Sequence, residues 1–335
     1  MTPFTYARPM DAGAAIAAVL ADPAASFIAG GSNLLDLWKE GVARPSALVD
    51  ITRLPGLDGV AEHGDGLRIG ALARNSHVAD DARVRELYPL LAQALLAASS
   101  PQLRNAATMG GNMLQRTRCP YFTDTSMACN KRNPGAGCAA LTGWAHIHAI
   151  LGASLNCIAT YPGDMAVALV ALDATMQVQG ADGERTVAVE GFHRLPGDRP
   201  DLDTELQHGE LILSVDLPAP RFGDHVTYLK VRERSSYAFA SVSVAAALRV
   251  EGGLIAEARI VLGGVAHRPW RATAAEASLV GQPTGTEAYK AAAAIALQGA
   301  ASVPDTAYKI TLARRSIPRA LALAEAGHPS FTVSN

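Results

Sequence analysis

The chain has 335 residues, of which 49% are hydrophobic and 18% charged, with 29 Lys and Arg against 31 Asp and Glu. This length leaves room for two domains and a large core, and the low charge excludes a largely disordered chain. Because the formal net charge is only −2, no basic field favours nucleic acid as a partner. We expect no membrane span, since no apolar run reaches about 18 residues. We also expect no signal peptide in this chain, since its first residues lack a basic region followed by an apolar block.

The first hundred residues alternate short apolar runs with helical patterns. The predicted strands lie at residues 27–29, 47–51 and 67–71, and the predicted helices at 11–20, 34–38 and 88–98. This part of the chain is therefore expected to be an α/β unit.

Residues 115–158 show neither the helical nor the strand spacing of apolar residues. Pro120, Pro134, Gly135 and Gly137 fall within them, and so do all four cysteines of the chain. A structureless segment of this length inside a compact domain usually has a function or is held by something external.

Regular patterns return after residue 158. We expect helices at 164–172, 273–280, 287–297 and 317–326, strands at 174–179, 211–217, 226–231, 240–250 and 258–262, and a loop at 195–208. Turn residues cluster at 218–224, which makes a domain boundary near residue 220. Strands followed by helices predict a compact α+β domain beyond it.

The four cysteines follow the pattern C-x9-C-x8-C-x18-C, at Cys119, Cys129, Cys138 and Cys157. Four thiolates in one loop-rich segment can hold a zinc ion or a [4Fe–4S] cluster, and neither the short zinc knuckle nor the short ferredoxin spacing is present. The spacing thus predicts a metal site without naming the metal. Buried free thiols and disulfides are the alternatives.

Two glycine turns carry the second set of candidates. Gly30 and Gly31 stand between a predicted strand and a predicted helix, and Gly110 and Gly111 follow Thr108. Backbone N–H groups at such turns can approach a pyrophosphate. Neither turn is part of G-x-G-x-x-G or of a P-loop, so the pair of turns, and not either turn alone, suggests two walls around a diphosphate.

Asp164 and Lys230 each have two interpretations. Asp164 stands at a predicted helix start, where it is typical of an N-cap, or it accepts a hydrogen bond from a sugar hydroxyl or ring N–H. Lys230 lies on a strand of alternating charges, which is usually a solvated face, although a cation there could also stabilise a reduced ring.

These motifs, in this order, resemble one family. IAGGSNLLDL, LRNAATMGGNM, a Pro-x-Asp helix start, GELI and LKVRERSSYAFA are similar to the FAD-binding medium subunit of the xanthine dehydrogenase family of molybdenum hydroxylases. The resemblance implies an α+β fold, with an FAD-binding domain of the vanillyl-alcohol-oxidase (PCMH) type over residues 1–220 and the family's small C-terminal domain over 221–335. Residues 115–158 would be a segment inserted in the first domain.

The resemblance also implies cofactor ligands. The FAD contacts would be Phe27, Ile28, Ala29, Gly30, Gly31, Ser32, Asn33, Leu34, Thr108, Gly110, Gly111, Asn112, Asp164, Ile212 and Lys230. Of these, Asp164 would hold the adenosine side, and Ile212 and Lys230 would lie at the isoalloxazine. Most such subunits lack the four cysteines, whose presence in QRTRCPYF, CNKRNPGAGCAAL and CIATYPGDMA resembles the three-subunit bacterial aldehyde oxidoreductases of the periplasmic type. A [4Fe–4S] cluster would then be bound by Cys119, Cys129, Cys138 and Cys157.

By this resemblance the chain is an electron-transfer subunit without catalytic residues of its own. A large molybdopterin-binding subunit would convert an aldehyde and water to a carboxylic acid. Electrons would then pass through a small subunit with [2Fe–2S] clusters to FAD and on to an external acceptor. We expect the periplasm, by co-export with a signal-bearing partner, and the cytoplasm as the alternative. A stand-alone flavin oxidase or reductase and a zinc-stapled interaction subunit are the competing hypotheses.

Overall fold

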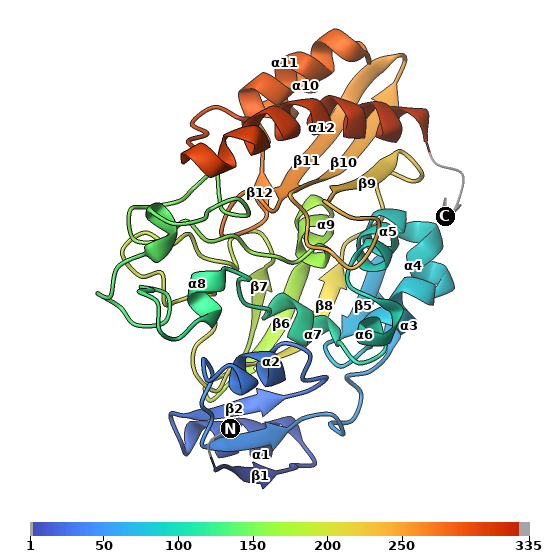
Figure 1. Cartoon of the computed structure of the whole chain (residues 1–335). Helices are drawn as coiled ribbons and strands as arrows, with labels where there is room; N and C mark the ends of the chain where they lie inside the picture. Colours follow the sequence, from blue (N-terminus) through green and yellow to red (C-terminus); the bar gives the residue numbers. More distant parts are fainter. Residues whose placement is uncertain (1–2, 328–335) are drawn as a thin grey trace.

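A computed structural model describes residues 3–327, and in it helices and sheets are mixed as the α+β expectation requires (Figure 1). The structure contains a three-stranded sheet, a five-stranded sheet and a four-stranded sheet, which follow one another from the N-terminal to the C-terminal end of the chain. Among residues 3–327, no helix is long and apolar enough to cross a bilayer.

The N-terminal sheet is parallel and has the order β1-β3-β2. Its elements are β1 (Thr5–Ala7), α1 (Ala12–Leu20), β2 (Ala25–Ile28), α2 (Leu34–Lys39) and β3 (Ala47–Asp50). The side chain of Asp11 starts α1 because it accepts a hydrogen bond from the N–H of Ala14 at 2.8 Å. The predicted strand–glycine turn–helix unit is thereby confirmed as β2, a turn and α2.

The middle sheet is antiparallel, in the order β4-β5-β8-β6-β7. Its strands are β4 (Val60–His63), β5 (Gly66–Gly70), β6 (Thr175–Gly180), β7 (Gly183–Ala188) and β8 (Leu211–Leu217). The helices between β5 and β6 in the chain are α3 (Asn75–Asp80), α4 (Ala82–Leu87), α5 (Pro89–Ala97), α6 (Pro101–Arg104), α7 (Met109–Met113), α8 (Pro120–Thr123), the 3₁₀ turn η1 (Ala139–Leu141) and α9 (Met165–Ala171). An ion pair between Arg68 of β5 and Asp216 of β8 joins these two strands at 2.6 Å. The two residues are 148 positions apart in the chain.

The C-terminal sheet has the order β12-β11-β10-β9, and helices pack on it. Its strands are β9 (Val226–Val231), β10 (Val242–Glu251), β11 (Leu254–Gly263) and β12 (Trp270–Arg271). Its helices are α10 (Thr273–Leu279), α11 (Thr286–Ala296), the 3₁₀ turn η2 (Pro304–Thr306) and α12 (Ala307–Ala326). The expectation of a helix beginning at residue 317 was wrong, because α12 begins ten residues earlier. Its buried face there consists of Lys309, Ala313 and Ser316, which do not form an apolar stripe in the sequence.

The centre of the molecule is the region where α9 packs between α5 on one side and β10 and β11 on the other. All seven residues of α9 are buried, which explains why its sequence is apolar all round. The strand β10 is also apolar on both faces: Val244, Ala246 and Leu248 join one core cluster, and Ala245 and Ala247 join another. The two clusters therefore meet across this strand.

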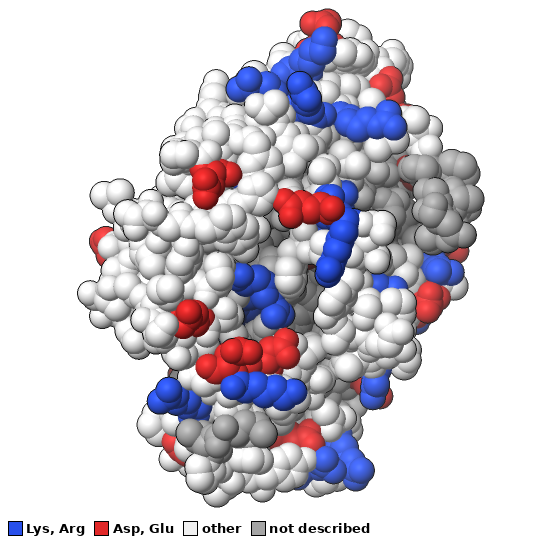
Figure 2. Space-filling model, viewed as in Figure 1, with Lys and Arg blue, Asp and Glu red and all other residues white. Residues whose placement is uncertain are grey.

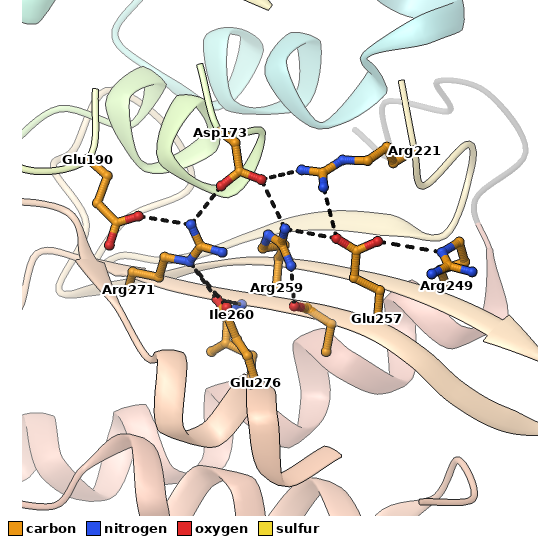
Figure 3. Close-up of polar contacts among 10 residues, drawn as sticks. Asp173, Glu190, Arg221, Arg249, Glu257, Arg259, Ile260, Arg271 and Glu276 are labelled. Carbon is orange, nitrogen blue, oxygen red and sulfur yellow. Dashed lines mark hydrogen bonds and ion pairs between the residues drawn. The ribbon is translucent and has the colours of Figure 1, made fainter. Parts of the chain in front are cut away.

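Ion pairs link the middle part of the chain to the C-terminal sheet beside α9. Asp173 accepts hydrogen bonds from Arg259 at 2.9 Å, from Arg271 at 2.6 Å and from Arg221 (Figure 3). Asp173 has a φ of 54°, a left-handed conformation that Asn and Asp tolerate better than most residues. The network spans segments nearly a hundred residues apart, so it fixes how they pack.

Residues 115–158 contain only α8 and η1 as regular elements, which confirms the expected irregular segment. Side chains of the segment itself and of α12 hold its backbone in place by hydrogen bonds to carbonyl oxygens. Arg132 donates to the carbonyl oxygens of Tyr121 at 2.9 Å and Phe122 at 2.8 Å. Lys309 of α12, fully buried, donates to the carbonyl oxygens of His148 at 2.8 Å and Ile147 at 3.3 Å.

Candidate functional site

Both glycine turns line a single cavity of about 370 Å³, named here the two-turn cavity. The predicted residues on its wall are Phe27, Ile28, Ala29, Gly30, Gly31, Ser32, Asn33, Leu34, Thr108, Gly110, Gly111 and Ile212. The two glycine pairs thus face one cavity as expected, but Gly110 and Gly111 lie inside the short helix α7 and not in a loop turn; this pair is still called the second turn below. On the face shown in Figure 2, acidic and basic side chains are interspersed, and basic side chains flank a hollow near the middle.

The first turn has little room for anything but glycine. Gly31 has a φ of +70°, and a Cβ on Gly30 would collide with the carbonyl oxygen of Ala106, just before the second turn. The two turns thus touch through backbone. Any larger residue at position 30 would push them apart.

The first turn also presents unused hydrogen-bond donors. Within residues 3–327, the N–H groups of Gly30, Gly31, Ser32 and Asn33 donate to no protein atom, and the buried side-chain amino group of Asn33 has no partner. A row of N–H groups without protein acceptors at a cavity wall fits a ligand with several anionic oxygens.

The second turn is tied to the middle sheet instead. The N–H of Gly110 donates to the carbonyl oxygen of Ala71 at 2.8 Å, and the N–H of Gly111 to the hydroxyl of Thr108 at 3.3 Å. Thr108 caps α7 through this bond. The second turn therefore supplies shape and a fixed wall, while the first supplies the free donors.

Asn112, Asp164 and Lys230 lie away from the wall of this cavity. Asp164 accepts from Lys230 at 2.8 Å and from the hydroxyl of Tyr228 at 2.7 Å, and all three side chains are nearly inaccessible. Asp164 stands at the N-cap position of α9, as the helix-start interpretation predicted, but its side chain makes no capping bond to that helix. The solvated-face interpretation of Lys230 is wrong, since its side chain is 4% exposed.

Glu210 and Arg116 are the charged residues on the cavity wall. Glu210 is held by Arg185 through two bonds of 2.6 and 2.7 Å, and the Arg185 partner lowers the pKa of that carboxyl. Neither Arg116 nor Glu210 was singled out in the sequence. The signal available for Arg116 was its place five residues after Gly111 of the second turn.

All four cysteines line a second, smaller cavity, named here the cysteine pocket, together with Phe122 and Lys131. Cys119, Cys129 and Cys157 are buried and Cys138 is partly buried. None forms a disulfide. The sequence placed these four residues in one segment, and the structure confirms that they converge.

The thiols differ in acidity. A hydrogen bond from Cys157 lowers the pKa of Cys138 to about 6 and raises that of Cys157, while burial raises the pKa of Cys119 to about 11. Metal binding needs thiolates, so occupancy of this pocket would release protons.

Two buried imidazoles border the pocket. Nε2 of His148 lies 3.1 Å from Sγ of Cys119, and Nε2 of His267 lies 3.3 Å from Sγ of Cys157. His146 lies elsewhere, 2.5 Å from a carboxylate oxygen of Glu233. His267 is 110 residues from Cys157, and no local pattern could have indicated it.

The part of the chain that the structure describes contains no three His, Cys, Asp or Glu side chains in the arrangement of a metal-ion site. The donor chemistry of the cysteine pocket nevertheless suits a metal cluster, since four thiols border one space.

Comparisons with known families divide the sequence into two matches. The family described as "FAD binding domain in molybdopterin dehydrogenase" matches residues 2–220, and the "CO dehydrogenase flavoprotein C-terminal domain" matches residues 227–324. Together they span nearly the whole chain.

Curated relatives match over the same extent. The chain is 46% identical to the aldehyde oxidoreductase FAD-binding subunit PaoB of Escherichia coli K12, over 97% of this chain and 99% of the relative. It is 29% identical to the carbon monoxide dehydrogenase medium chain of Hydrogenophaga pseudoflava, over 95% of this chain and 96% of the relative.

Solved structures agree. A chain of the carbon monoxide dehydrogenase from Hydrogenophaga pseudoflava superposes with a TM-score of 0.76 at 28% identity, covering 97% of this chain and 98% of that one. A chain of quinoline 2-oxidoreductase from Pseudomonas putida 86 gives 0.75 at 26% identity, over 97% and 98%.

Proposed function

The chain belongs to the family of FAD-binding medium subunits of the xanthine and carbon monoxide dehydrogenases, and on that premise we propose that it carries FAD and a [4Fe–4S] cluster for a molybdenum-dependent aldehyde oxidoreductase. The observation that carries the FAD assignment is the convergence of both glycine turns on one cavity with unused backbone donors. The 46% identity to an aldehyde oxidoreductase subunit supports the substrate class.

The two-turn cavity fits a dinucleotide in chemistry. Free N–H groups at Gly30 to Asn33 suit a pyrophosphate, and apolar side chains such as Phe27, Leu114 and Ile212 suit flat rings. Bound FAD would supply one- and two-electron chemistry. The chain's own residues hold and orient it, and the apolar wall keeps water from it.

Asp164 and Lys230 are proposed to serve the same cofactor from beside the cavity. Their buried ion pair keeps a carboxylate and a cation fixed at the start of α9, a helix that contacts α7. Because both side chains are nearly inaccessible, the pair would support the cofactor site through the packing that it fixes.

Cys119, Cys129, Cys138 and Cys157 are proposed as ligands of the [4Fe–4S] cluster. Their convergence on one pocket supports this, as does the irregular backbone around them, which a cluster would brace. The cluster would supply one-electron redox chemistry, and the pocket's burial would shield it from solvent.

The proposed partners are a large molybdopterin-binding subunit, where an aldehyde and water become a carboxylic acid, and a small subunit with [2Fe–2S] clusters. FAD in this chain would take the electrons and release them to an external acceptor. The full-length similarity to the FAD-binding subunit of an aldehyde oxidoreductase supports a role beside other subunits. Co-export to the periplasm with a signal-bearing partner is the proposed location.

Anaerobic reduction tests this function. The complex assembled with its partner subunits should lose its flavin bands when an aromatic or aliphatic aldehyde is added. The isolated chain should lose them only with dithionite. Bleaching of the isolated chain by aldehyde would instead indicate a stand-alone flavin enzyme, and a colourless zinc-containing chain would contradict both cofactor assignments.

A further inference from the structure

Arg116 is the only cation on the wall of the two-turn cavity among residues 3–327. Its counterpart Glu210 is already neutralised by Arg185, with two bonds of 2.6 and 2.7 Å. An anionic ligand in this cavity therefore meets one charged side chain of opposite sign.

Arg116 is tied to the first turn and fixed in orientation. Its backbone N–H donates to Oδ1 of Asn33 at 3.1 Å, and its guanidinium carbon lies 4.6 Å from the ring centre of Phe122. Nε donates to Oδ2 of Asp203 at 2.5 Å. Within the described residues, the two terminal amino groups of the guanidinium donate to no protein atom, so they are available to a ligand.

Asp203 holds a second cation on the far side. Its Oδ1 lies 2.5 Å from Nζ of Lys131, a side chain that is 4% exposed and lines the cysteine pocket. Lys131 also donates to the carbonyl oxygen of Pro200 at 2.7 Å. Burial raises the pKa of Asp203, but the charges of Arg116 and Lys131 outweigh it and hold that pKa below its usual value.

We propose that Arg116 binds the pyrophosphate of FAD, and that Asp203 positions it there while holding Lys131 at the cysteine pocket. Arg116, Asp203 and Lys131 thus form one charged bridge, named here the triad, between the two cofactor sites. This inference rests on the proposed function, because it needs FAD in the two-turn cavity.

The physical basis is charge and geometry together. A guanidinium binds phosphate oxygens with paired N–H donors, and its plane is fixed here by Phe122. The free N–H groups of the first turn and the side chain of Asn33 line the same cavity as Arg116. A pyrophosphate placed there would satisfy donors that otherwise have no acceptor.

Equilibrium binding to the flavin-free full chain tests the role of Arg116, with FAD and riboflavin as probes. Arg116→Gln should raise the Kd of FAD at least about tenfold and leave the Kd of riboflavin, which has no phosphate, within about twofold. Arg116→Lys should restore part of the FAD affinity. The matched control is Arg199→Gln, which breaks an exposed Arg–Asp pair on the loop that carries Asp203.

Two results would overturn the role of Arg116. One is an unchanged Kd of FAD in Arg116→Gln. The other is an equal rise for riboflavin, which would indicate damage to the cavity and no phosphate contact. A wild-type chain that binds neither probe would refute the proposed function itself, which keeps the two failures apart.

The positioning role of Asp203 needs its own variants. Asp203→Asn should raise the Kd of FAD several-fold without affecting riboflavin and should lower the iron retained per chain, because Lys131 loses its counter-ion. Asp203→Glu keeps the carboxylate and should recover both. Asp201→Asn, which breaks the exposed pair with Arg199, should change neither. Wild-type values for FAD affinity and iron in Asp203→Asn would contradict the bridge.

Discussion

The two-turn cavity and the cysteine pocket share the triad but are built in different ways. The cavity lies between the end of β2, the residue after β5 and the start of α7, where Gly30 lets its turn approach the backbone of Ala106. The pocket lies in an irregular segment whose shape depends on side chains from distant parts of the chain, such as Lys309 and His267. A substitution in the backbone of the cavity should therefore lower FAD affinity without changing iron content. A substitution in the distant contacts of the pocket should lower iron content together with the free energy of unfolding.

The largest expected effect is on the backbone contact of the cavity. Gly30→Val should raise the Kd of FAD at least about 100-fold, close to 3 kcal/mol, because its side chain displaces Ala106 and separates the turns. Iron bound at the cysteines should be unchanged. The control Gly59→Ala, where a Cβ meets nothing within 4 Å, should bind FAD as the wild type does. Equal loss of iron and FAD in Gly30→Val would contradict the claim that the cavity and the pocket are built independently.

The next effect concerns the distant support of the pocket. Lys309→Met should lower the free energy of unfolding by about 3 kcal/mol, since it leaves the carbonyl oxygens of His148, Ile147 and Gly264 without their hydrogen-bond donor. Chemical denaturation measures this, and the iron content should fall with it. Lys290→Met removes an exposed lysine of α11 and should cost little. A Lys309 variant with wild-type stability and iron would refute the long-range account.

A smaller effect depends on pH. Burial lowers the pKa of His193 to about 4, so between pH 6.5 and 4 the unfolded chain binds a proton that the folded chain does not. Stability from the neutral ring is therefore complete above pH 6.5 and is lost as the pH falls, by about 2 kcal/mol near pH 5.

Denaturation at a series of pH values checks this prediction. His193→Gln should flatten the loss between pH 6.5 and 5, and His77→Gln, at an exposed position, should leave it as in the wild type. An unchanged slope in His193→Gln would show that other groups cause the acid sensitivity.

The smallest effect lies outside both sites. Asp173→Asn keeps a residue that tolerates the left-handed backbone but weakens the ion pairs with Arg221, Arg259 and Arg271. Because Asp173 is partly exposed, the loss should be about 1 kcal/mol of unfolding free energy. FAD affinity and iron content should stay unchanged, and a change in either would mean that the packing of the C-terminal sheet sets the geometry of the sites.

The elements that could be predicted from the sequence are those with a local cause. The strand, glycine turn and helix around Gly30 follow from an apolar run and a break, and β10 follows from its continuous apolar residues. The start of α12 could not be predicted, because its buried face holds Lys309, which is satisfied only by carbonyl oxygens of a distant segment.

The same division applies to the sites. The glycine turns and the cysteines could be found because each motif is local in the chain. Arg116, Lys131 and Asp203 meet only after folding, since Lys131 and Asp203 are 72 residues apart. Asp164 looked like a helix cap, and its real partners, Tyr228 and Lys230, lie more than sixty residues away.

The measurement that tests the central claim most directly is the amount of flavin, iron and acid-labile sulfide per chain in the protein purified without air. Two separate sites predict one FAD together with about four irons and about four sulfides. Flavin without iron and sulfide, or zinc in place of iron, would contradict the assignment of the cysteine pocket. Iron and sulfide without flavin would contradict the assignment of the two-turn cavity.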